Sequence, residues 1–503
     1  MEELQQVAQT PLAPPSTLQE VFQQVLARDP RLAALEYLGQ EYDWAWMRDV
    51  SDRLEAVLAA ADLPPNAPVA IIATQDPALY AAFIGLVAHG RSMTMIYSFQ
   101  SHEVIRRDIE NLGVGAVIAA AQMWTAEPLA GASEAGAMAI SLSSDGNVAI
   151  VNGVDRARAS LRQMAEPGVE LLTSGTTGPP KRHLLPYRVL KRTLIDFCYP
   201  PDRKASPGQP HPLIFPFANV GGVLNLTGAI AREQLLLLEP KFSIDRLLAF
   251  IERTRLPAYQ VPPPGIKMLL DANVPVDAFA GVRYFNVGAG AVDPDHRRLF
   301  EQRYGVKILM SYGATEYAGA AAAMSAADLD QYGDAKFDAV GRPIPGVTIR
   351  IVDRETGEVL PPGVDHVGLV EVLQPAIDDN WIRSNDLGAL DEDGFLYLKG
   401  RADAVINRGG FKVHPSVIEG AITQHPAVAA ACVLGIADER LGMVPVAAVE
   451  LKPGAELTEA ELDAHLRKLL QSTYIPAAYR FVDTMPRTPT LKIQAGQIRA
   501  LFT

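Results

Sequence analysis

The chain has 503 residues, of which 48% are hydrophobic and 20% charged, and its formal net charge is -13. This length exceeds what one hydrophobic core usually supports, so we expect a globular protein with two or more domains. The negative charge argues against a nucleic-acid-binding or anionic-membrane surface, although an anionic ligand needs only a local positive field.

Two cysteines, Cys198 and Cys432, stand far apart and outside any metal-like spacing. A disulfide scaffold and a zinc site are therefore not expected. We expect two buried free thiols in a reducing compartment. The N-terminal residues Met1–Gln6 lack an apolar signal core, and the longest apolar runs are far shorter than a membrane span. The sequence therefore predicts a cytoplasmic protein without membrane insertion.

Short apolar runs alternate with helical patterns along most of the chain, which is typical of α/β layers with mainly parallel sheets. Residues 1 to about 20 contain three prolines and are expected to form a loose arm. The elements predicted after this arm are a strand at Val69–Ala73, a helix at Pro77–Gly90, strands at Gly115–Ala119 and Gln234–Leu238, a helix at Ile244–Arg253 and a strand at Tyr284–Val287.

The last hundred residues are typical of a small α+β unit that begins after Lys399–Asp403. Ser416–Thr423 has a helical pattern, and Val444–Leu451 alternates as a strand does. Thr458 and Glu461 have the spacing of a capping box before another helix.

The segment Leu171–Lys181 is the most informative one, because its centre, Thr173–Gly178, consists only of Gly, Ser and Thr. Backbone N–H groups of such a loop can wrap a phosphate chain, its hydroxyls can donate to phosphate oxygens, and Lys181 adds charge. It is not a Walker A loop, because the pattern Gly-x-x-x-x-Gly-Lys-[Ser/Thr] is absent. Taken alone, such a segment is more often a flexible surface loop.

Further motifs follow in order: Tyr312-Gly-Ala-Thr-Glu316, Ser384-Asn-Asp-Leu387, Gly400-Arg-Ala-Asp403 and Lys492. Together with Thr173–Lys181 they resemble the adenylate-forming superfamily of acyl-CoA synthetases, adenylation domains and luciferases, over roughly residues 20 to 500. The resemblance implies a large N-terminal AMP-binding domain of layered sheets and helices at residues 1–400. It also implies a small mobile α+β lid domain at residues 404–503, with a hinge near residues 401–403.

The reaction that the resemblance implies is attack of a carboxylate on the α-phosphate of ATP, release of pyrophosphate, and transfer of the acyl group from the adenylate to CoA. Two anions must meet, so charge neutralisation and positioning are the main demands. By resemblance, the loop that grips pyrophosphate consists of Thr173, Ser174, Gly175, Thr176, Thr177, Gly178 and Lys181.

The same resemblance implies the other ligand contacts. Gly288, Ala289 and Gly290 would form a wall of the adenine pocket, and Tyr312, followed by Gly313 and Ala314, would stack on adenine. Thr315 would donate to a phosphate oxygen and Glu316 would hold Mg²⁺, which prefers one or two carboxylates plus phosphate oxygens. Asp386 would accept the ribose hydroxyls, Arg401 would contact ribose or phosphate, and Asp403 would be the hinge. Lys492 would bridge the carboxylate and the α-phosphate, and Gly409, Gly410 and Phe411 would line the channel for the pantetheine arm of CoA.

Each motif also has a plain alternative. Residues 288–290 could be an ordinary strand-end turn, and residues 312–316 a solvated loop. Asp403 could form a surface salt bridge, and Gly409 with Gly410 could be a turn before a helix that begins at a proline.

Three residues depart from the family pattern. Arg182 and Leu491 stand where the family usually has glycine, so Arg182 could alter the motion of the loop and Leu491 places a side chain close to the ligand. Asn385 also replaces a glycine, which we expect to be a mild change because asparagine tolerates positive φ.

The segment Phe215–Gly222 contains no Asp to hold a substrate amine, so a small aryl or acyl carboxylic acid without an α-amine is expected, with Ala218 and Asn219 on the substrate wall. ATP, Mg²⁺ and CoA are the expected cofactors, and a homodimer is left open. Two other functions also remain: a free-standing adenylation enzyme that loads a carrier protein, and a non-catalytic nucleotide-binding relative.

Overall fold

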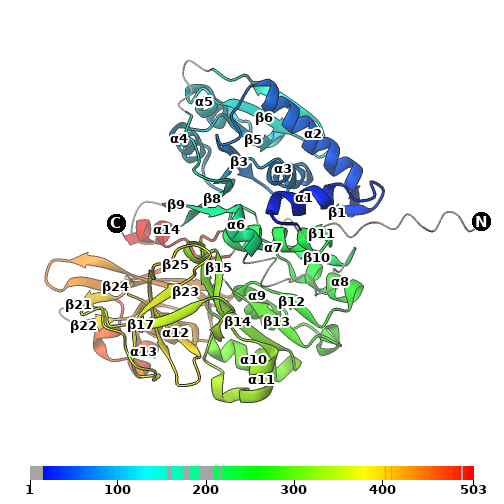
Figure 1. Cartoon of the computed structure of the whole chain (residues 1–503). Coiled ribbons are helices and arrows are strands. Elements are labelled where there is room, and N and C mark those ends of the chain that lie inside the picture. The colour runs from blue at the N-terminus through cyan, green and yellow to red at the C-terminus, as the bar shows by residue number, and fades with distance from the viewer. Residues whose placement is uncertain are drawn as a thin grey trace, which may run out of the picture. The chain divides into compact units, whose positions relative to one another are not determined.

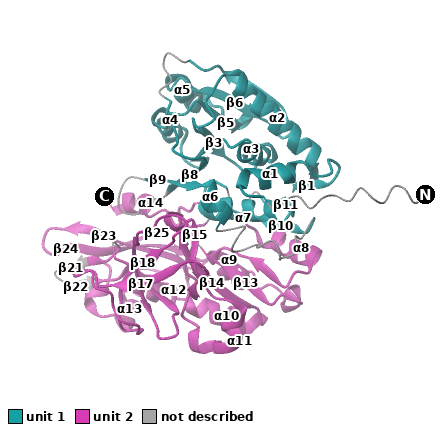
Figure 2. Ribbon diagram, viewed as in Figure 1, with its two compact units in different colours: residues 1–173, 180–241 teal, residues 174–179, 242–503 magenta. Residues whose placement is uncertain are grey.

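The computed structural model describes residues 15–155, 161–173, 181–192, 208–215, 217–239, 241–288, 290–402, 404–408, 411–488 and 491–502. The chain divides into two compact units (Figures 1 and 2). Unit 1 comprises residues 1–173 and 180–241, and unit 2 comprises residues 174–179 and 242–503. Every helix within the described ranges is too short or too polar to cross a membrane.

Unit 1 contains a seven-stranded sheet of order β7-β6-β5-β3-β4-β8-β9 and a four-stranded sheet of order β10-β11-β1-β2. Its helices are α1 (Leu18–Leu26), α2 (Trp44–Ala60), α3 (Pro77–Ala88), α4 (His102–Asn111), α5 (Ala126–Glu134), α6 (Tyr187–Leu190) and α7 (Val220–Ala231). Its strands are β1 (Ala33–Tyr37), β2 (Gln40–Asp43), β3 (Val69–Ala73), β4 (Met93–Tyr97), β5 (Ala116–Ala120), β6 (Met138–Leu142), β7 (Val148–Asn152), β8 (Gly168–Thr173), β9 (Lys181–Pro186), β10 (Pro210–Leu213) and β11 (Leu235–Leu238).

The centre of the large sheet is parallel and buried on both faces. Every residue of β3 and of β5 is buried, as expected for strands that helices cover on both sides. Helices α4 and α5 lie on one side of this sheet and α2 and α3 on the other (Figure 1). Helix α3 is buried along its whole length, because it is apolar on every face; Asp76 caps its N-terminus and Pro77 occupies its first turn.

Unit 2 contains three sheets, of which the first mixes parallel and antiparallel pairs and the second is antiparallel. Their orders are β12-β13-β14-β15-β16, then β17-β18-β19-β20, then β22-β21-β24-β23 with β25 paired to β24. The strands are β12 (Ala258–Gln260), β13 (Tyr284–Val287), β14 (Lys307–Ala314), β15 (Gly319–Ala323), β16 (Arg342–Pro343), β17 (Thr348–Val352), β18 (Gly368–Leu373), β19 (Ile382–Leu390), β20 (Leu396–Arg401), β21 (Ile406–Arg408), β22 (Phe411–Val413), β23 (Val428–Asp438), β24 (Gly442–Leu451) and β25 (Tyr479–Val482).

The helices of unit 2 are α8 (Ile244–Thr254), α9 (Pro263–Asp271), α10 (Pro294–Tyr304), α11 (Ala326–Tyr332), α12 (Pro415–Thr423), α13 (Glu459–Leu469) and α14 (Ala495–Arg499). The last of the three sheets, with α12 and α13, has an apolar core of its own that includes Ile418, Val449 and Leu466. A second cluster packs Ile498 of α14 against Val446. The last hundred residues therefore form an α+β module, as predicted.

Most of the predicted elements are confirmed. Strands β3 and β13 have the predicted bounds, and α13 begins with the predicted capping box of Thr458 and Glu461. The prediction of mainly parallel sheets holds in unit 1, whereas unit 2 has many antiparallel pairs. The predicted N-terminal arm is too long, because α1 begins at Leu18 behind a capping box and buries Leu18, Val21 and Phe22.

Candidate functional site

Tyr312, Asp386 and Arg401 come together on three strands of unit 2. Tyr312 lies near the end of β14, and Asp386 and Arg401 are cross-strand partners on β19 and β20. The Tyr312 hydroxyl donates to one carboxylate oxygen of Asp386 at 2.7 Å, and Nη1 of Arg401 donates to the other at 3.2 Å. A carboxylate has about four acceptor positions, so Asp386 retains capacity for a ligand with two hydroxyls.

The backbone next to Asp386 is fixed by Ser384. The Ser384 hydroxyl accepts a hydrogen bond from the Asp386 N–H at 3.1 Å and donates to the carbonyl of Val370 on β18 at 2.8 Å. Asn385 is in extended β19 and does not have a positive φ, so its tolerance of positive φ is not used here. The carbonyl of Asn385 accepts from the N–H of Ala402 at 2.7 Å, which holds the residue in the sheet.

Two buried tyrosines, Tyr312 and Tyr317, lie beside Asp386. Tyr312 is 7% exposed and Tyr317 is 2% exposed, and their hydroxyls lie 3.3 Å apart. The pKa of the Tyr312 phenol is raised above its usual range, first by burial and then by Tyr317 and Asp386. Tyr312 therefore stays protonated and acts as a donor toward Asp386.

The rest of the Tyr312–Glu316 motif is ordered secondary structure, not a solvated loop. Gly313 lies at an irregularity in the pairing of β14 with β15, where a Cβ would be 2.1 Å from the Gly319 carbonyl oxygen. Ala314 ends β14, and Thr315 and Glu316 form a short 3-10 helix, both partly buried. The close approach of the two strands explains why the motif has glycine at this position.

The first glycine of the predicted adenine wall follows β13 directly. A Cβ on Gly288 would lie 2.4 Å from the Ser311 hydroxyl, so a larger residue here would displace that side chain. Gly290 is exposed, and Ala289 lies outside the described residues. A strand-end turn and a ligand wall remain equally compatible with this geometry.

Lys492 lies on a tight loop of the C-terminal module. The N–H of Thr488 donates to the Lys492 carbonyl at 2.8 Å, and the Thr488 hydroxyl accepts from the Lys492 N–H at 3.1 Å. The Arg487 guanidinium donates to the Leu491 carbonyl at 3.2 Å. Leu491 itself has a φ of 62°, the left-handed conformation that glycine adopts most readily. The predicted departure from glycine is thus a residue held in an unfavourable backbone conformation.

The electrostatic surroundings of Lys492 connect it to the group around Asp386. The residue retains an exposed surface, yet the pKa of its ammonium is lowered, first by desolvation and further by the charge of Arg401. The charge of Asp386 acts in the opposite direction. In the described part of unit 2, Tyr312, Asp386 and Arg401 are therefore joined by hydrogen bonds, and the ammonium of Lys492 lies within reach of the charges of Asp386 and Arg401.

Four further predicted site residues belong to the described part of unit 1. Thr173 ends β8 and Lys181 begins β9, and the two are cross-strand partners in an antiparallel pair. Ala218 is buried at 2% exposure. Asn219 is the N-cap of α7, where its side-chain oxygen accepts from the N–H of Gly222 at 2.9 Å. Part of its hydrogen-bonding capacity is therefore used by the helix.

Several predicted residues lie outside the described residues: Ser174, Gly175, Thr176, Thr177, Gly178, Ala289, Asp403, Gly409 and Gly410. The backbone of Phe411 begins β22. The sequence analysis gave no role to Ser384, Tyr317 and Thr488, which hold the predicted residues in place. The only signals for them were that Ser384 stands inside a quoted motif and that Thr488 stands close to Lys492 in the sequence.

The described residues do not contain a cluster of three or more His, Cys, Asp or Glu side chains that could hold a metal ion by themselves. Glu316 fits the weaker demand of Mg²⁺, for which one carboxylate suffices when phosphate oxygens supply other ligands. Of the two predicted free thiols, Cys432 is buried and unpaired, and burial raises its pKa to about 12; Cys198 lies outside the described residues.

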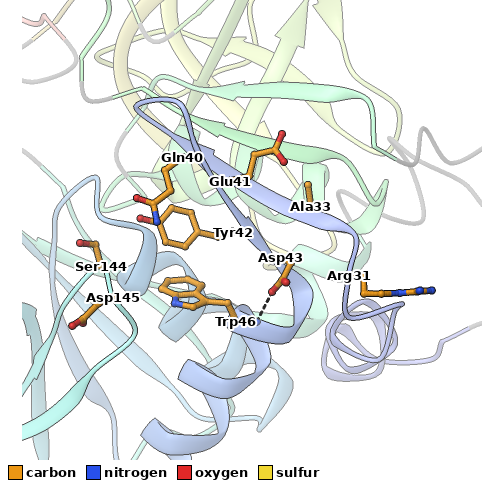
Figure 3. A pocket seen from close by; sticks show the side chains of 9 residues that line it. All are labelled: Arg31, Ala33, Gln40, Glu41, Tyr42, Asp43, Trp46, Ser144 and Asp145. Atoms are coloured by element: carbon orange, nitrogen blue, oxygen red, sulfur yellow. Dashed lines mark hydrogen bonds between the residues drawn. The ribbon is translucent and has the colours of Figure 1, made fainter.

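A surface pocket of about 510 Å³ lies in unit 1, and none of the predicted site residues lines it (Figure 3). The rings of Tyr42 and Trp46 lie 4.5 Å apart at this pocket, with the carboxylates of Asp43 and Asp145 nearby. Both carboxylates have structural roles, because Asp43 accepts from the N–H of Trp46 and Asp145 accepts from Ser143 and the N–H of Asn147.

The chain matches known proteins over most of its length. The family model of AMP-binding enzymes matches residues 22–376, and the model of the AMP-binding enzyme C-terminal domain matches residues 417–492. A sulfoacetate–CoA ligase of Cupriavidus necator is 30% identical over 347 residues, 65% of this chain and 66% of that protein. A fatty acid–[acyl-carrier-protein] ligase, ScoC, of Streptomyces coeruleorubidus is 30% identical over 67% of each chain. The matched segments thus span about two thirds of these relatives.

The fold has a close counterpart among solved structures. The crystal structure of ATP-bound MatB from Rhodopseudomonas palustris superposes with a TM-score of 0.79 over 96% of this chain and 99% of that one. The sequence identity is 24%, so this likeness supports the α/β fold with a large N-terminal and a smaller C-terminal domain.

Proposed function

The chain belongs to the AMP-binding enzyme family of the adenylate-forming superfamily, and from this premise we propose that it is an AMP-forming acid–CoA ligase. It would activate a carboxylic acid with ATP, release pyrophosphate, and transfer the acyl group to the thiol of CoA. The observation that carries the proposal is the convergence of Tyr312, Asp386, Arg401 and Lys492 in unit 2.

In this proposal Asp386 binds the ribose of ATP. Its carboxylate accepts from the two ribose hydroxyls, and its bonds from Tyr312 and Arg401 hold it in one orientation. Because Tyr312 remains protonated, that orientation does not change over the working pH range. Glu316 holds Mg²⁺ together with phosphate oxygens, and the metal supplies charge neutralisation when it is bound.

Lys492 acts on the reacting carboxylate and the α-phosphate. Negative charge accumulates between these groups in the transition state, so an ammonium placed there lowers the barrier more than it tightens substrate binding. Its partial desolvation favours this role, since a charge in a poorly solvated position interacts more strongly with its partners. Lys181 and the hydroxyl-rich segment after Thr173 bind the leaving pyrophosphate.

The proposal also concerns the acceptor of the acyl group and the class of acid that is activated. CoA is favoured by the name of the Cupriavidus relative, whereas the name of ScoC favours a carrier protein as the second candidate. A substrate without an α-amine is favoured by Phe215–Gly222, which contains no Asp. Of the two departures that would suggest a non-catalytic relative, Arg182 has a structural explanation in its ion pair with Asp108, whereas Leu491 is a non-glycine residue in the left-handed conformation.

The test is a panel of acids measured for AMP release with CoA, with a phosphopantetheinylated carrier protein, and without an acceptor. The panel contains a short sulfonated or dicarboxylic acid, an aryl acid and a fatty acid. CoA-dependent AMP release with one class supports the ligase, and release only with the carrier protein supports the second candidate. Absence of acid-dependent pyrophosphate–ATP exchange with every acid would refute both.

The role of Lys492 is tested by Lys492→Ala, with Lys468→Ala on the exposed side of α13 as the control. We expect the first variant to lose pyrophosphate–ATP exchange by about 100-fold or more, as for removal of a group that stabilises transition-state charge. The second should retain the wild-type rate. An unchanged rate in Lys492→Ala would remove Lys492 from the proposed site.

A further inference from the structure

The guanidinium of Arg182 is held by hydrogen bonds to α4 and β4 in unit 1. Its Nη2 atom lies 2.7 and 2.6 Å from the two carboxylate oxygens of Asp108 on α4, and its Nη1 donates to the Met95 carbonyl on β4 at 2.9 Å. The side chains of Arg182 and Asp108 are 15% and 19% exposed. This is a largely desolvated ion pair, which differs from the exposed surface pairs that contribute little to a structure.

The Arg182–Asp108 ion pair lies beside β8 and β9, the two strands that the predicted phosphate-binding segment connects. Arg182 is the cross-strand partner of Leu172, and the carbonyl of Leu172 accepts from the Tyr97 hydroxyl of β4 at 3.1 Å. Deeper along β8, Glu170 forms two hydrogen bonds of 2.8 Å with Arg162. The ends of β8 and β9 are thus tied to β4 and α4 by charged and polar contacts.

The position of Lys181 follows from this arrangement. Successive side chains of a strand point to opposite faces, so the anchoring of Arg182 on the α4 face directs Lys181 to the other face. Lys181 is exposed there, at the first position of β9. Without the anchor, the end of β9 could twist, and the direction of Lys181 would no longer be fixed.

We infer that Arg182, through its ion pair with Asp108, is a positioning residue that fixes the direction of Lys181, the proposed phosphate-binding lysine. The inference rests on the proposed function, in which Lys181 binds phosphate. It also assigns a use to the replacement of glycine by arginine at this position. The guanidinium is not an extra phosphate ligand, because Asp108 and Met95 engage it on the opposite face.

Steady-state kinetics of the full chain test the inference, with Arg182→Met, Arg182→Met/Asp108→Asn and the control Arg107→Met. Arg107 pairs with Glu103 on the exposed surface of the same helix α4. We expect Arg182→Met to raise KM for ATP about tenfold with kcat changed less than about threefold, as when a contact made equally in ground and transition states is weakened. Arg107→Met should have the wild-type KM.

The double variant separates positioning from stability. Removal of the Asp108 charge relieves the lone buried carboxylate, so part of the thermal stability lost in Arg182→Met should return. The raised KM should not return with it, because Lys181 still lacks its anchor. A wild-type KM in Arg182→Met, or a KM that recovers together with stability, would overturn the inference.

Hydrogen exchange of the backbone amides at positions 182–185 gives a readout that does not depend on turnover. We expect these amides to exchange about tenfold faster in Arg182→Met than in the wild type and in Arg107→Met, as for a locally destabilised strand. Unchanged exchange would refute the anchoring of β9 by Arg182. If the amides of Arg182→Met exchanged faster but the wild type showed no acid-dependent reaction, the proposed function would fail while the anchoring of β9 by Arg182 remained.

Discussion

The left-handed conformation of Leu491 makes the Lys492 loop sensitive to the residue that precedes the lysine. A φ of 62° costs a residue with a Cβ about 1–2 kcal/mol relative to a relaxed backbone. Glycine avoids this cost but loses about 0.5–1 kcal/mol through the greater freedom of the unfolded chain. The two effects nearly offset, so Leu491→Gly should change the free energy of unfolding by less than about 1 kcal/mol, although it removes a whole side chain.

Valine at the same position should behave differently. A branched Cβ tolerates positive φ poorly, so Leu491→Val should lower the free energy of unfolding by at least about 1 kcal/mol more than Leu491→Gly does. Ile493 provides a matched control, because it is partly buried in the same loop and forms an antiparallel bridge with Arg487. Ile493→Gly should therefore cost about 2 kcal/mol.

Urea unfolding of the three variants and the wild type measures these differences, and pyrophosphate–ATP exchange reports whether the loop still presents Lys492. We expect Leu491→Gly to retain the exchange rate within about threefold, because the backbone conformation is the one glycine prefers. The reasoning is refuted if Leu491→Val is as stable as the wild type, or if Leu491→Gly costs as much as Ile493→Gly.

Three further predictions follow from the same structure. Desolvation and Arg401 lower the pKa of Lys492 from 10.5, so the rate of pyrophosphate–ATP exchange at saturating ATP should fall with rising pH before an ordinary lysine titrates. Asp386→Asn removes the charge that raises this pKa, so in that variant the rate should fall at a lower pH. A fall in rate only at the ordinary lysine pKa would contradict the desolvation. Gly313→Ala should cost more than about 2 kcal/mol in urea unfolding, because its Cβ would meet the β15 backbone, whereas Gly420→Ala in α12 meets nothing and should be neutral or stabilising. Burial lowers the pKa of His211 from 6.5 to about 4, so the unfolded chain binds a proton first as the pH falls. The free energy of unfolding should therefore drop by about 3 kcal/mol between pH 6.5 and pH 4. His211→Asn should reduce this slope in urea unfolding, and an equal slope in both proteins would show that another group is responsible.

The sequence predicts local elements well where an apolar run is bounded by turn residues. Strands β3 and β13 and the capping box of α13 are of this kind, because the signal lies within a few residues. The motif series also indicated which residues belong to one site, although Tyr312 and Asp386 are 74 positions apart.

Interactions between distant residues without a motif could not be predicted. Arg182 and Asp108 are also 74 positions apart, and no local pattern marks them as partners. The same limit applies at Asn385, where sheet pairing, not the tolerance of asparagine for positive φ, decides the backbone conformation. Residue type indicates what a position can adopt, whereas tertiary hydrogen bonds decide what it does adopt.

The contacts that shape the Lys492 loop and the charges that tune its ammonium come from different parts of the chain. Thr488 and Arg487 hold the loop from within the C-terminal module, whereas Asp386 and Arg401 act on the amine from β19 and β20. Location and proton affinity of this one group can therefore be adjusted separately. Substitutions at Thr488 would redirect the amine, and substitutions at Arg401 would retune its acidity, which gives protein engineers two independent controls over a single reactive nitrogen.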